Sequence, residues 1–291
     1  MLDLLSVRVE DVGGAVASQV NPSNFSPANS LLVVLIHGYN VNKQNAAASY
    51  GAFTGLLTKY GVPLLSTYGQ VVGFCWPGDV NLGIFSGLSY PTEMGTVRQS
   101  AALLANFLTR LKGPQGLPMQ VIIVAHSLGN RLALQMVNNV LQQANTVWGR
   151  IEGFCLMAAA VSVGMVENAN DLGAAAQASR TTRVLFSKDD TVLHWAFPPG
   201  ETAAFEGFFP QAVGRFGNPV STWTSRFDLQ PYNHGDYFPG KGSDDRSARY
   251  VAQFLGAAVP TELSTSQLSS HTLPSPNVIA ARQVGNATIS Q

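Results

Sequence analysis

The feature that most constrains the fold is a series of short apolar runs, rich in Val, Ile and Leu, that alternate with longer helical patterns. The runs are Leu31–Ile36, Val71–Trp76, Val121–Ala125, Ile151–Met157 and Thr182–Ser187. Continuous apolar runs of this length are typical of strands that are buried on both faces of a parallel sheet. Their alternation with helices predicts an α/β fold with a doubly wound, mostly parallel sheet flanked by helices.

Helical patterns follow each of these runs or come after the last of them. They cover Asn42–Tyr60, Glu93–Lys112, Leu128–Ala144, Met165–Ser179 and Ser243–Val259. Thr92 and Ser243 are the expected N-caps of the second and last helices, because a short hydroxyl side chain accepts hydrogen bonds from N–H groups at a helix start. We expect one or two antiparallel edge strands in the residues before Leu31.

Two segments interrupt this alternation. Residues 195–232 carry nine aromatic side chains among scattered Pro and Gly, and the stretch is too long for an ordinary connection. It is expected to be either an irregular surface excursion or an insertion that forms a lid or pocket wall. Residues 260–291 are rich in Ser and Thr with two full charges, which predicts an extended polar tail. Residues 1–259 are therefore expected to form one domain.

Composition argues against a nucleic-acid partner. Hydrophobic residues make up 46% of the 291 residues, which is enough apolar material for a substantial core. The 17 basic side chains are balanced by 17 acidic ones, and no basic stripe is visible. Nucleic-acid binding requires clustered Lys and Arg, so it is not expected.

The sequence also bears on the compartment. The longest near-apolar run, Phe154–Val166, has 13 residues, whereas a membrane-spanning helix needs about 20. The first ten residues lack the basic and then apolar pattern of a signal peptide. Cys75 and Cys155 lie inside apolar runs and are expected to be buried thiols rather than a disulfide. We therefore expect a cytoplasmic protein without a membrane span.

The strongest local signal is the segment Val121–Gly129, which reads VIIVAHSLG and is followed at once by a helical pattern. A serine at a sharp turn between a buried strand and a helix is held on a strained backbone with its hydroxyl exposed. Small residues are needed two positions before and two after the serine, because neighbouring backbone crowds there. Ala125 and Gly129 meet that need, so Ser127 is the candidate nucleophile.

A second buried strand ends in the sequence HGYN, residues 37–40. An acyl-transfer enzyme stabilises its oxyanion with preorganised N–H donors. One expected donor is the backbone N–H of Leu128, directly after the serine. The other is expected from the HGYN loop, with Tyr39 as the first candidate and Asn40 as the alternative. His37 is expected to orient that loop by hydrogen bonds rather than to act in catalysis.

Serine is a poor nucleophile without a base, so one of the five histidines is needed. His234 follows the last sheet element and precedes the final helix, which is where the base belongs in the chain order Ser, acid, His. His126 adjoins the serine and is expected to point away from the cleft. His271 lies in the tail, and His194 is too close in sequence to the candidate acid. His234 is therefore the candidate base.

The fifth apolar run ends in SKDDTVL, residues 187–193, which contains two adjacent carboxylates. An acid at this point would hold and orient the histidine. The spacing favours Asp190, with Asp189 as the alternative. Asp79 ends the second run, and there a solvated turn residue is expected, with a place in the pocket wall as the alternative.

These residues resemble a known family. The motifs HGYN at 37–40, WPG at 76–78, AHSLGNR at 125–131, the turn at Asp190 and HGDYF at 234–238 look like those of the α/β-hydrolases. The resemblance is closest to a poorly characterised bacterial subgroup with the same His-Gly-Tyr-Asn and Trp-Pro signatures. It covers roughly residues 30–258 and implies a serine hydrolase with Ser127, Asp190 and His234 as its triad. It implies no defined substrate, and 195–232 and the tail depart from it.

The residues favour hydrolysis of a carboxylic ester through an acyl-enzyme, with no metal or organic cofactor. The aromatic content of 195–232 and the segment Leu82–Leu88 indicate an apolar pocket, which would suit a medium acyl or aromatic ester. Amides, thioesters, lactones and acyl transfer use the same machinery, so the fold cannot separate them. The alternative is a non-catalytic binding or structural module on the same fold, whose C-terminal tail docks onto a partner protein.

Overall fold

An eight-stranded sheet is the centre of the computed structural model, which describes residues 2–62, 69–79, 90–143, 151–239, 242 and 244–258. The strands are β1 (Asp3–Arg8), β2 (Val16–Asn21), β3 (Leu31–Ile36), β4 (Gly69–Cys75), β5 (Gln120–His126), β6 (Ile151–Met157), β7 (Thr181–Phe186) and β8 (Ser225–Asp228). Their order in the sheet is β2-β1-β4-β3-β5-β6-β7-β8. Every neighbouring pair is parallel except β1 and β2, which are antiparallel.

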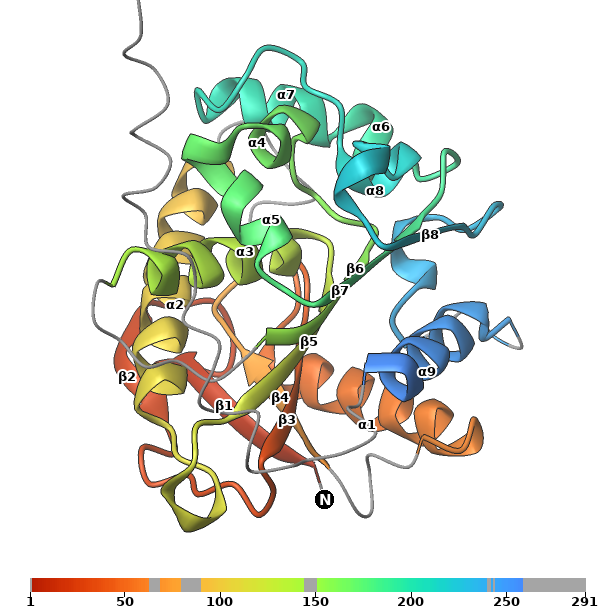
Figure 1. Cartoon of the computed structure of the whole chain (residues 1–291). Coiled ribbons are helices and arrows are strands. Elements are labelled where there is room, and N and C mark those ends of the chain that lie inside the picture. Colours follow the sequence, from red (N-terminus) through yellow and green to blue (C-terminus); the bar gives the residue numbers. More distant parts are fainter. Residues whose placement is uncertain are drawn as a thin grey trace, which may run out of the picture. The chain divides into compact units, whose positions relative to one another are not determined.

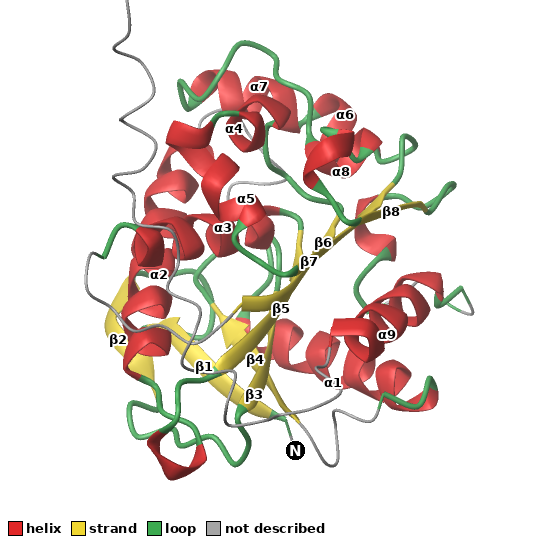
Figure 2. Ribbon diagram, viewed as in Figure 1, coloured by secondary structure: helices red, strands yellow, loops and turns green. Residues whose placement is uncertain are grey.

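Helices lie on both faces of this sheet (Figures 1 and 2). They are α1 (Lys43–Lys59), α2 (Tyr90–Arg110), α3 (Leu128–Leu141), α4 (Val163–Glu167), α5 (Ala174–Gln177), α6 (Thr191–Trp195), α7 (Phe197–Ala203), α8 (Val213–Phe216) and α9 (Arg246–Ala258). Helices α1 and α9 cover one face, and α2, α3 and α5 cover the other (Figure 1). The prediction of a doubly wound, mostly parallel α/β fold is confirmed.

The central strands have the burial that the apolar runs predict. Every residue of β3, β5 and β6 is buried, because helices cover both of their faces. Strands β3 and β6 have the predicted bounds, and the other three predicted strands begin or end one or two residues away. Cys75 and Cys155 lie in β4 and β6, and burial raises the pKa of both thiols to about 12.

One edge of the sheet agrees with the prediction of one or two antiparallel strands, and the other edge differs from what the sequence predicts. Only β2 is an antiparallel edge strand, since β1 pairs in parallel with β4 and lies inside the sheet. At the other edge, β8 lies within 195–232 and pairs in parallel with β7, so part of that stretch extends the sheet. The sequence gives little sign of β8, because its four residues, SRFD, are half-buried or exposed and form no apolar run.

Two helix predictions are also wrong in detail. Met165–Ser179 is divided into α4, a π-type turn at Ala169–Gly173, and α5. Asn168 causes the break, because its side chain accepts a hydrogen bond from Asn170 N and caps a new turn. Helix α2 begins at Tyr90, so Thr92 lies inside its first turn and is not the N-cap.

The last helix begins at Arg246, where the side chain of Asp244 accepts a hydrogen bond from Arg246 N. Ser243, the segment Leu82–Leu88 and the tail 260–291 lie outside the described residues. The described residues belong to one compact unit, Met1–Val259. Within them, no helix combines the length and the apolar character that crossing a bilayer requires.

The packing of β4 against α1 generates a stability prediction. A methyl group on Gly73 would lie 2.3 Å from the ring of Tyr50. That ring is fixed, because its hydroxyl donates to Phe74 O at 2.5 Å and accepts from His37 N at 2.9 Å. Gly73→Ala should therefore lower the free energy of unfolding by about 1–3 kcal/mol, measured by urea denaturation.

The control is Gly55→Ala in the exposed part of α1, where an added methyl group meets nothing within 4 Å. It should stabilise the protein by about 0.5–1 kcal/mol, because alanine favours a helix over glycine. Equal effects of the two substitutions would contradict the packing described.

Candidate active site

Ser127 occupies a tight turn between β5 and α3. Its backbone has φ 54° and ψ −128°, a region that a residue with a side chain rarely enters. Hydrogen bonds to the backbone at the end of β6 and just after it maintain this conformation. Ser127 N donates to Met157 O at 3.0 Å, and Ser127 O accepts from Ala160 N at 3.2 Å. Backbone strain of this kind persists only where the surroundings enforce it, and it is frequent at functional sites.

A second turn crosses this one at very short range. A methyl group on Gly38 would lie 2.6 Å from Ser127 Cβ, and one on Gly129 would lie 2.4 Å from His37 O. Neither position can therefore carry a side chain. The absence of Cβ atoms at Gly38 and Gly129 brings the loop after β3 into direct contact with the turn that carries Ser127.

The structure brings Ser127, His234 and Asp190 together, although they are 107 and 44 positions apart. His234 Nε2 lies 2.6 Å from Ser127 Oγ, and His234 Nδ1 lies 2.8 Å from Asp190 Oδ2. Asp190 is fully buried, and its Oδ1 accepts from Leu193 N at 2.9 Å. The geometry forms a continuous hydrogen-bonded relay of carboxylate, imidazole and hydroxyl.

Only one of the two adjacent aspartates enters this relay. Asp190 is the N-cap of α6, so its carboxylate is fixed at the end of the turn after β7. Asp189 is exposed, and its backbone N–H donates to Ser187 Oγ. The carboxylate that contacts the imidazole is thus that of Asp190 and not that of Asp189, the alternative acid.

Residues that the sequence analysis missed hold the histidine in place. Asn233 and Asp236 form a capping box around the short turn at His234, with Asn233 N donating to Asp236 Oδ2 at 2.7 Å. Asn233 Oδ1 also accepts from the backbone N–H and hydroxyl of Thr191, next to Asp190. The Asn-x-x-Asp spacing around His234 is a sequence signal for this cap.

His126 does not point away from the site, so that expectation is wrong. Its Nε2 donates to the carbonyl oxygen of His234 at 2.9 Å, and the two rings are 5.1 Å apart. The loop that carries His234 crosses the end of β5. The ring of His234 faces Ser127, and the carbonyl group of His234 faces His126. Burial, helped by the nearby His234, lowers the pKa of His126 to about 3.

The loop after β3 contains both candidates for the second oxyanion donor. Asn40 N already donates to Gly78 O at 2.6 Å, which argues against Asn40 in that role. Tyr39 thus remains the better candidate. The other expected donor, Leu128, is the first residue of α3, where N–H groups have no partner within the helix.

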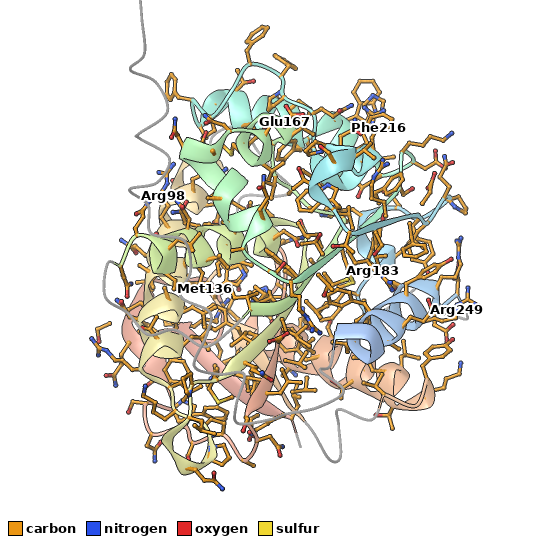
Figure 3. All side chains as sticks on the ribbon, viewed as in Figure 1. Arg98, Met136, Glu167, Arg183, Phe216 and Arg249 are labelled. Atoms are coloured by element: carbon orange, nitrogen blue, oxygen red, sulfur yellow. The ribbon has the colours of Figure 1, made fainter. Side chains whose placement is uncertain are left out.

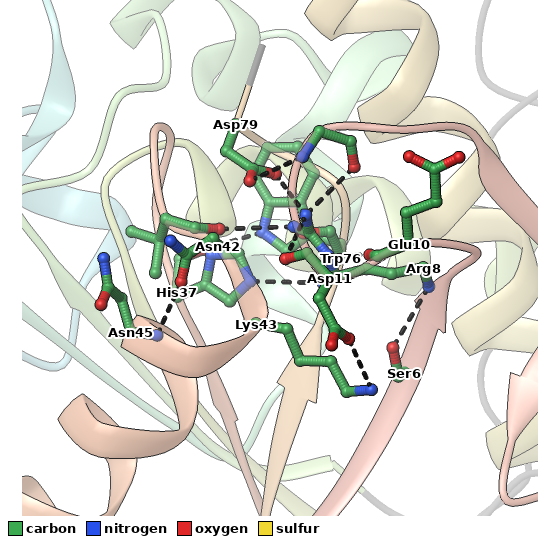
Figure 4. Close-up of polar contacts among 12 residues, drawn as sticks. Ser6, Arg8, Glu10, Asp11, His37, Asn42, Lys43, Asn45, Trp76 and Asp79 are labelled. Atoms are coloured by element: carbon green, nitrogen blue, oxygen red, sulfur yellow. Dashed lines mark hydrogen bonds and ion pairs between the residues drawn. The ribbon is translucent and has the colours of Figure 1, made fainter. Parts of the chain in front are cut away.

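His37 fixes the start of that loop through Trp76 (Figure 4). His37 Nε2 accepts from Trp76 N at 3.2 Å, and Trp76 Nε1 donates to His37 O at 2.9 Å. The two rings are stacked with centroids 5.6 Å apart. Burial lowers the pKa of His37 to about 4, so it is a neutral hydrogen-bonding residue at physiological pH.

Asp79 is not the solvated turn residue that we expect from the sequence. It is buried, and its Oδ1 forms an ion pair with Arg8 at 2.6 Å. The sequence cannot reveal this, because Arg8 and Asp79 are far apart in the chain and only the parallel pairing of β1 with β4 brings them together. Among the residues that the structure describes, no group of three or more His, Cys, Asp or Glu side chains is placed to hold a metal ion.

The segment 195–232 is partly anchored to the helices beside the site. Glu206, after α7, pairs with Arg98 of α2 at 2.5 Å and with Arg131 of α3 at 3.2 Å; Arg98 is labelled in Figure 3. The aromatic residues of the segment are divided between core and surface. Phe197, Trp223 and Tyr232 are buried, whereas Trp195, Phe205, Phe208 and Phe209 are exposed.

Comparison with known proteins gives one family match. Residues 17–197 match the model of a family described as "Alpha/beta hydrolase of unknown function (DUF900)". An uncharacterized protein of Nostoc sp. is 26% identical in an alignment of 132 positions that covers 39% of this chain. The aligned part is 32% of that protein, so the chain spans about a third of the relative's length.

The solved structures that match this chain have low sequence identity to it. A monoacylglycerol lipase of Paleococcus ferrophilus is 13% identical, with 81% of this chain and 97% of that one covered and a TM-score of 0.38. An acyl-protein thioesterase 2 of Zea mays is 12% identical, with 81% and 95% covered and a TM-score of 0.42.

The buried His126 predicts a pH dependence of stability. In the unfolded chain His126 takes up a proton near its ordinary pKa of 6.5, whereas in the folded protein it does so only near pH 3. Its contribution to stability is therefore lost progressively as the pH falls from 6.5, by about 1.4 kcal/mol per pH unit. His126→Gln lacks this titrating imidazole. Between pH 8 and pH 5 the free energy of unfolding of the variant should therefore fall by about 2 kcal/mol less than that of the wild type.

Urea denaturation of the wild type and of His126→Gln, each at pH 8 and pH 5, gives the four free energies of unfolding that this comparison needs. Because other groups titrate equally in both proteins, the difference isolates His126. A variant with the same loss of stability as the wild type would show that His126 is not held neutral by the fold.

Proposed function

Because the chain belongs to this α/β-hydrolase family, we propose that it is a serine hydrolase that cleaves carboxylic esters through an acyl-enzyme. The observation that supports this most directly is the relay in which His234 Nε2 lies 2.6 Å from Ser127 Oγ and Nδ1 lies 2.8 Å from Asp190 Oδ2. These distances are within the range needed for proton transfer from a nucleophile to its base.

The relay assigns a role to each residue in the first half of the reaction. Asp190 accepts a hydrogen bond from His234 Nδ1–H, which keeps the proton of the neutral imidazole on Nδ1 and leaves Nε2 able to accept one. Ser127 Oγ attacks the carbonyl carbon of the ester while its proton passes to His234 Nε2. The imidazolium that forms is stabilised by the buried carboxylate of Asp190.

The negative charge that develops on the carbonyl oxygen needs fixed donors. We assign these to the backbone N–H groups of Leu128 and Tyr39, on the two turns that cross at Gly38. Such donors contribute more to the rate than most other elements of a site, because they need no reorganisation during the reaction. The strained backbone at Ser127 sets the direction of the Leu128 N–H, since the two residues share a peptide bond.

The second half of the reaction uses the same groups. His234 Nε2–H protonates the leaving oxygen as the C–O bond of the ester breaks, and an alcohol departs. A water molecule then attacks the acyl-enzyme while His234 accepts its proton, and that proton returns to Ser127 Oγ as the carboxylic acid leaves. No step in this sequence requires a metal ion or an organic cofactor.

For the substrate we propose an ester with a medium acyl chain or an aromatic group. Helix α6 begins directly after Asp190, and α7 follows it, so the aromatic-rich segment 195–232 starts beside the relay. We propose that the first part of this segment forms a wall of the acyl pocket. The segment after Asp228 instead belongs to the scaffold, because it follows β8 and leads to the cap of His234.

Removal of the nucleophile is the first test. Ser127→Ala should lower kcat on p-nitrophenyl esters by roughly 10⁴- to 10⁶-fold, because the acyl-enzyme can no longer form. Turnover of esters of graded chain length gives the measurement and the acyl preference. The matched control is Ser225→Ala in β8, which should retain wild-type turnover. A folded wild type that neither turns over esters nor reacts with a fluorophosphonate probe at Ser127 would instead indicate a non-catalytic module.

The assignment of the acid is tested by a pair of neighbouring substitutions. Asp190→Asn should lower kcat by roughly 10⁴-fold at neutral pH, because the amide NH2 can donate to Nδ1 and so favours the tautomer of His234 that carries its proton on Nε2. Asp189→Asn changes the same atoms one position earlier, at an exposed site, and should alter kcat less than about twofold. The reverse result in steady-state kinetics would make Asp189 the acid.

A further inference from the structure

The guanidinium of Arg8 is enclosed by polypeptide near the candidate oxyanion loop (Figure 4). Its side chain is 0% exposed and pairs with Asp79 Oδ1 at 2.6 Å. It also contacts five backbone carbonyl oxygens, of Glu10 at 3.1 Å, Asp11 at 3.1 Å, Gly13 at 3.1 Å, Val41 at 3.4 Å and Trp76 at 2.9 Å. The five N–H groups of an arginine are thus all given acceptors.

Two of these acceptors flank the loop at residues 37–40. Val41 directly follows the loop, and Trp76 is the residue that holds His37 through two hydrogen bonds. Arg8 Nη1 contacts the carbonyl oxygens of both residues. A single rigid group thus connects the two chain segments that meet beneath the loop.

The last residue of the loop is bonded to the same segment. Asn40 N donates to Gly78 O at 2.6 Å, and Gly78 precedes Asp79, the charged partner of Arg8. Tyr39 therefore lies between His37, which is fixed by Trp76, and Asn40, which is fixed by Gly78. The residues on either side of Tyr39 are thus held by the same segment, Trp76–Asp79, that contacts Arg8.

Burial of an ionised arginine is costly, and close packing of β1 would be achieved at lower cost by an apolar side chain. An apolar residue could not hold the carbonyl oxygens of separate segments at a fixed distance from one another. The guanidinium can do so, because its planar set of N–H donors fixes both the direction and the distance of each acceptor. Arg8 precedes residues 17–197, the part of the chain that matches the family model.

We propose that Arg8 is a positioning residue for ester hydrolysis, which holds the loop 37–40 so that the Tyr39 N–H faces the developing oxyanion. This inference rests on the proposed function. Arg8 acts through the loop and does not touch the substrate. Because displacement of a catalytic donor by about 1 Å can lower the rate about 10²-fold, loss of Arg8 should slow the chemical step more than substrate binding.

Arg8→Gln tests this inference by steady-state kinetics on the best p-nitrophenyl ester. The variant should show kcat lowered roughly 10- to 100-fold with KM changed less than about threefold, because the interaction is made in the transition state. Affinity for a trifluoromethyl ketone, which forms a tetrahedral adduct with an oxyanion, should fall by the same factor as kcat/KM. A merely structural role would not produce that proportionality.

The matched control is Arg183→Gln. Arg183 of β7, labelled in Figure 3, is a partly buried arginine, which donates to Ser225 Oγ and Tyr250 O on the side of α9. Its loss should lower the thermal midpoint while kcat and the ketone affinity stay within about twofold of the wild type.

The outcomes separate this inference from the proposed function. A wild type without esterase turnover and without a Ser127 adduct overturns the function itself. An active wild type whose folded Arg8→Gln variant keeps kcat within twofold, or loses kcat with unchanged ketone affinity, overturns the role of Arg8 alone. If Arg8→Gln does not fold, Asp79→Asn decides, since it keeps the shape of the side chain and removes the charged partner of Arg8. A proportional fall of kcat/KM and of ketone affinity in this variant supports the inference, and an unchanged kcat overturns it.

Discussion

The crossing of two backbone turns at Gly38 and Gly129 is the contact on which the rest of the site depends. Each glycine is required by the other turn, because a methyl group would lie 2.6 Å from Ser127 Cβ in one case and 2.4 Å from His37 O in the other. This contact brings the loop after β3 next to the serine on the turn after β5. Parallel neighbours in a sheet place the carboxyl ends of β3 and β5 at the same edge, so the topology makes the crossing possible.

Two uncharged histidines hold the loops around this crossing in place through hydrogen bonds. His37 links the loop to Trp76, and His126 links the end of β5 to the backbone of His234. Burial lowers the pKa of both far below neutrality, so neither competes with His234 for a proton at physiological pH. The charged groups pair elsewhere. Arg8 and Asp79 form an ion pair next to the loop, and Asp190 contacts His234 through Nδ1.

Much of this architecture was predictable from local patterns, and the remainder depended on contacts between distant segments. Apolar runs predicted the buried strands, because burial on both faces dictates their composition. Chain order and turn spacing were enough to select Ser127, Asp190 and His234 as residues that the fold would bring together. The sequence did not reveal β8, the pairing of Arg8 with Asp79 or the contact of His126 with His234 O, since each is created by the tertiary fold and leaves no periodic signal.

The central claim is that the hydroxyl at Ser127 is activated by the relay and that the crossed turns bind the oxyanion. A crystal structure of the protein after reaction with an alkyl phosphonate tests both parts at once. The account predicts a bond from Ser127 Oγ to phosphorus, with the phosphoryl oxygen about 2.7–3.1 Å from the backbone nitrogens of Leu128 and Tyr39. A phosphonate bonded to another residue, or a phosphoryl oxygen turned away from both nitrogens, would contradict it.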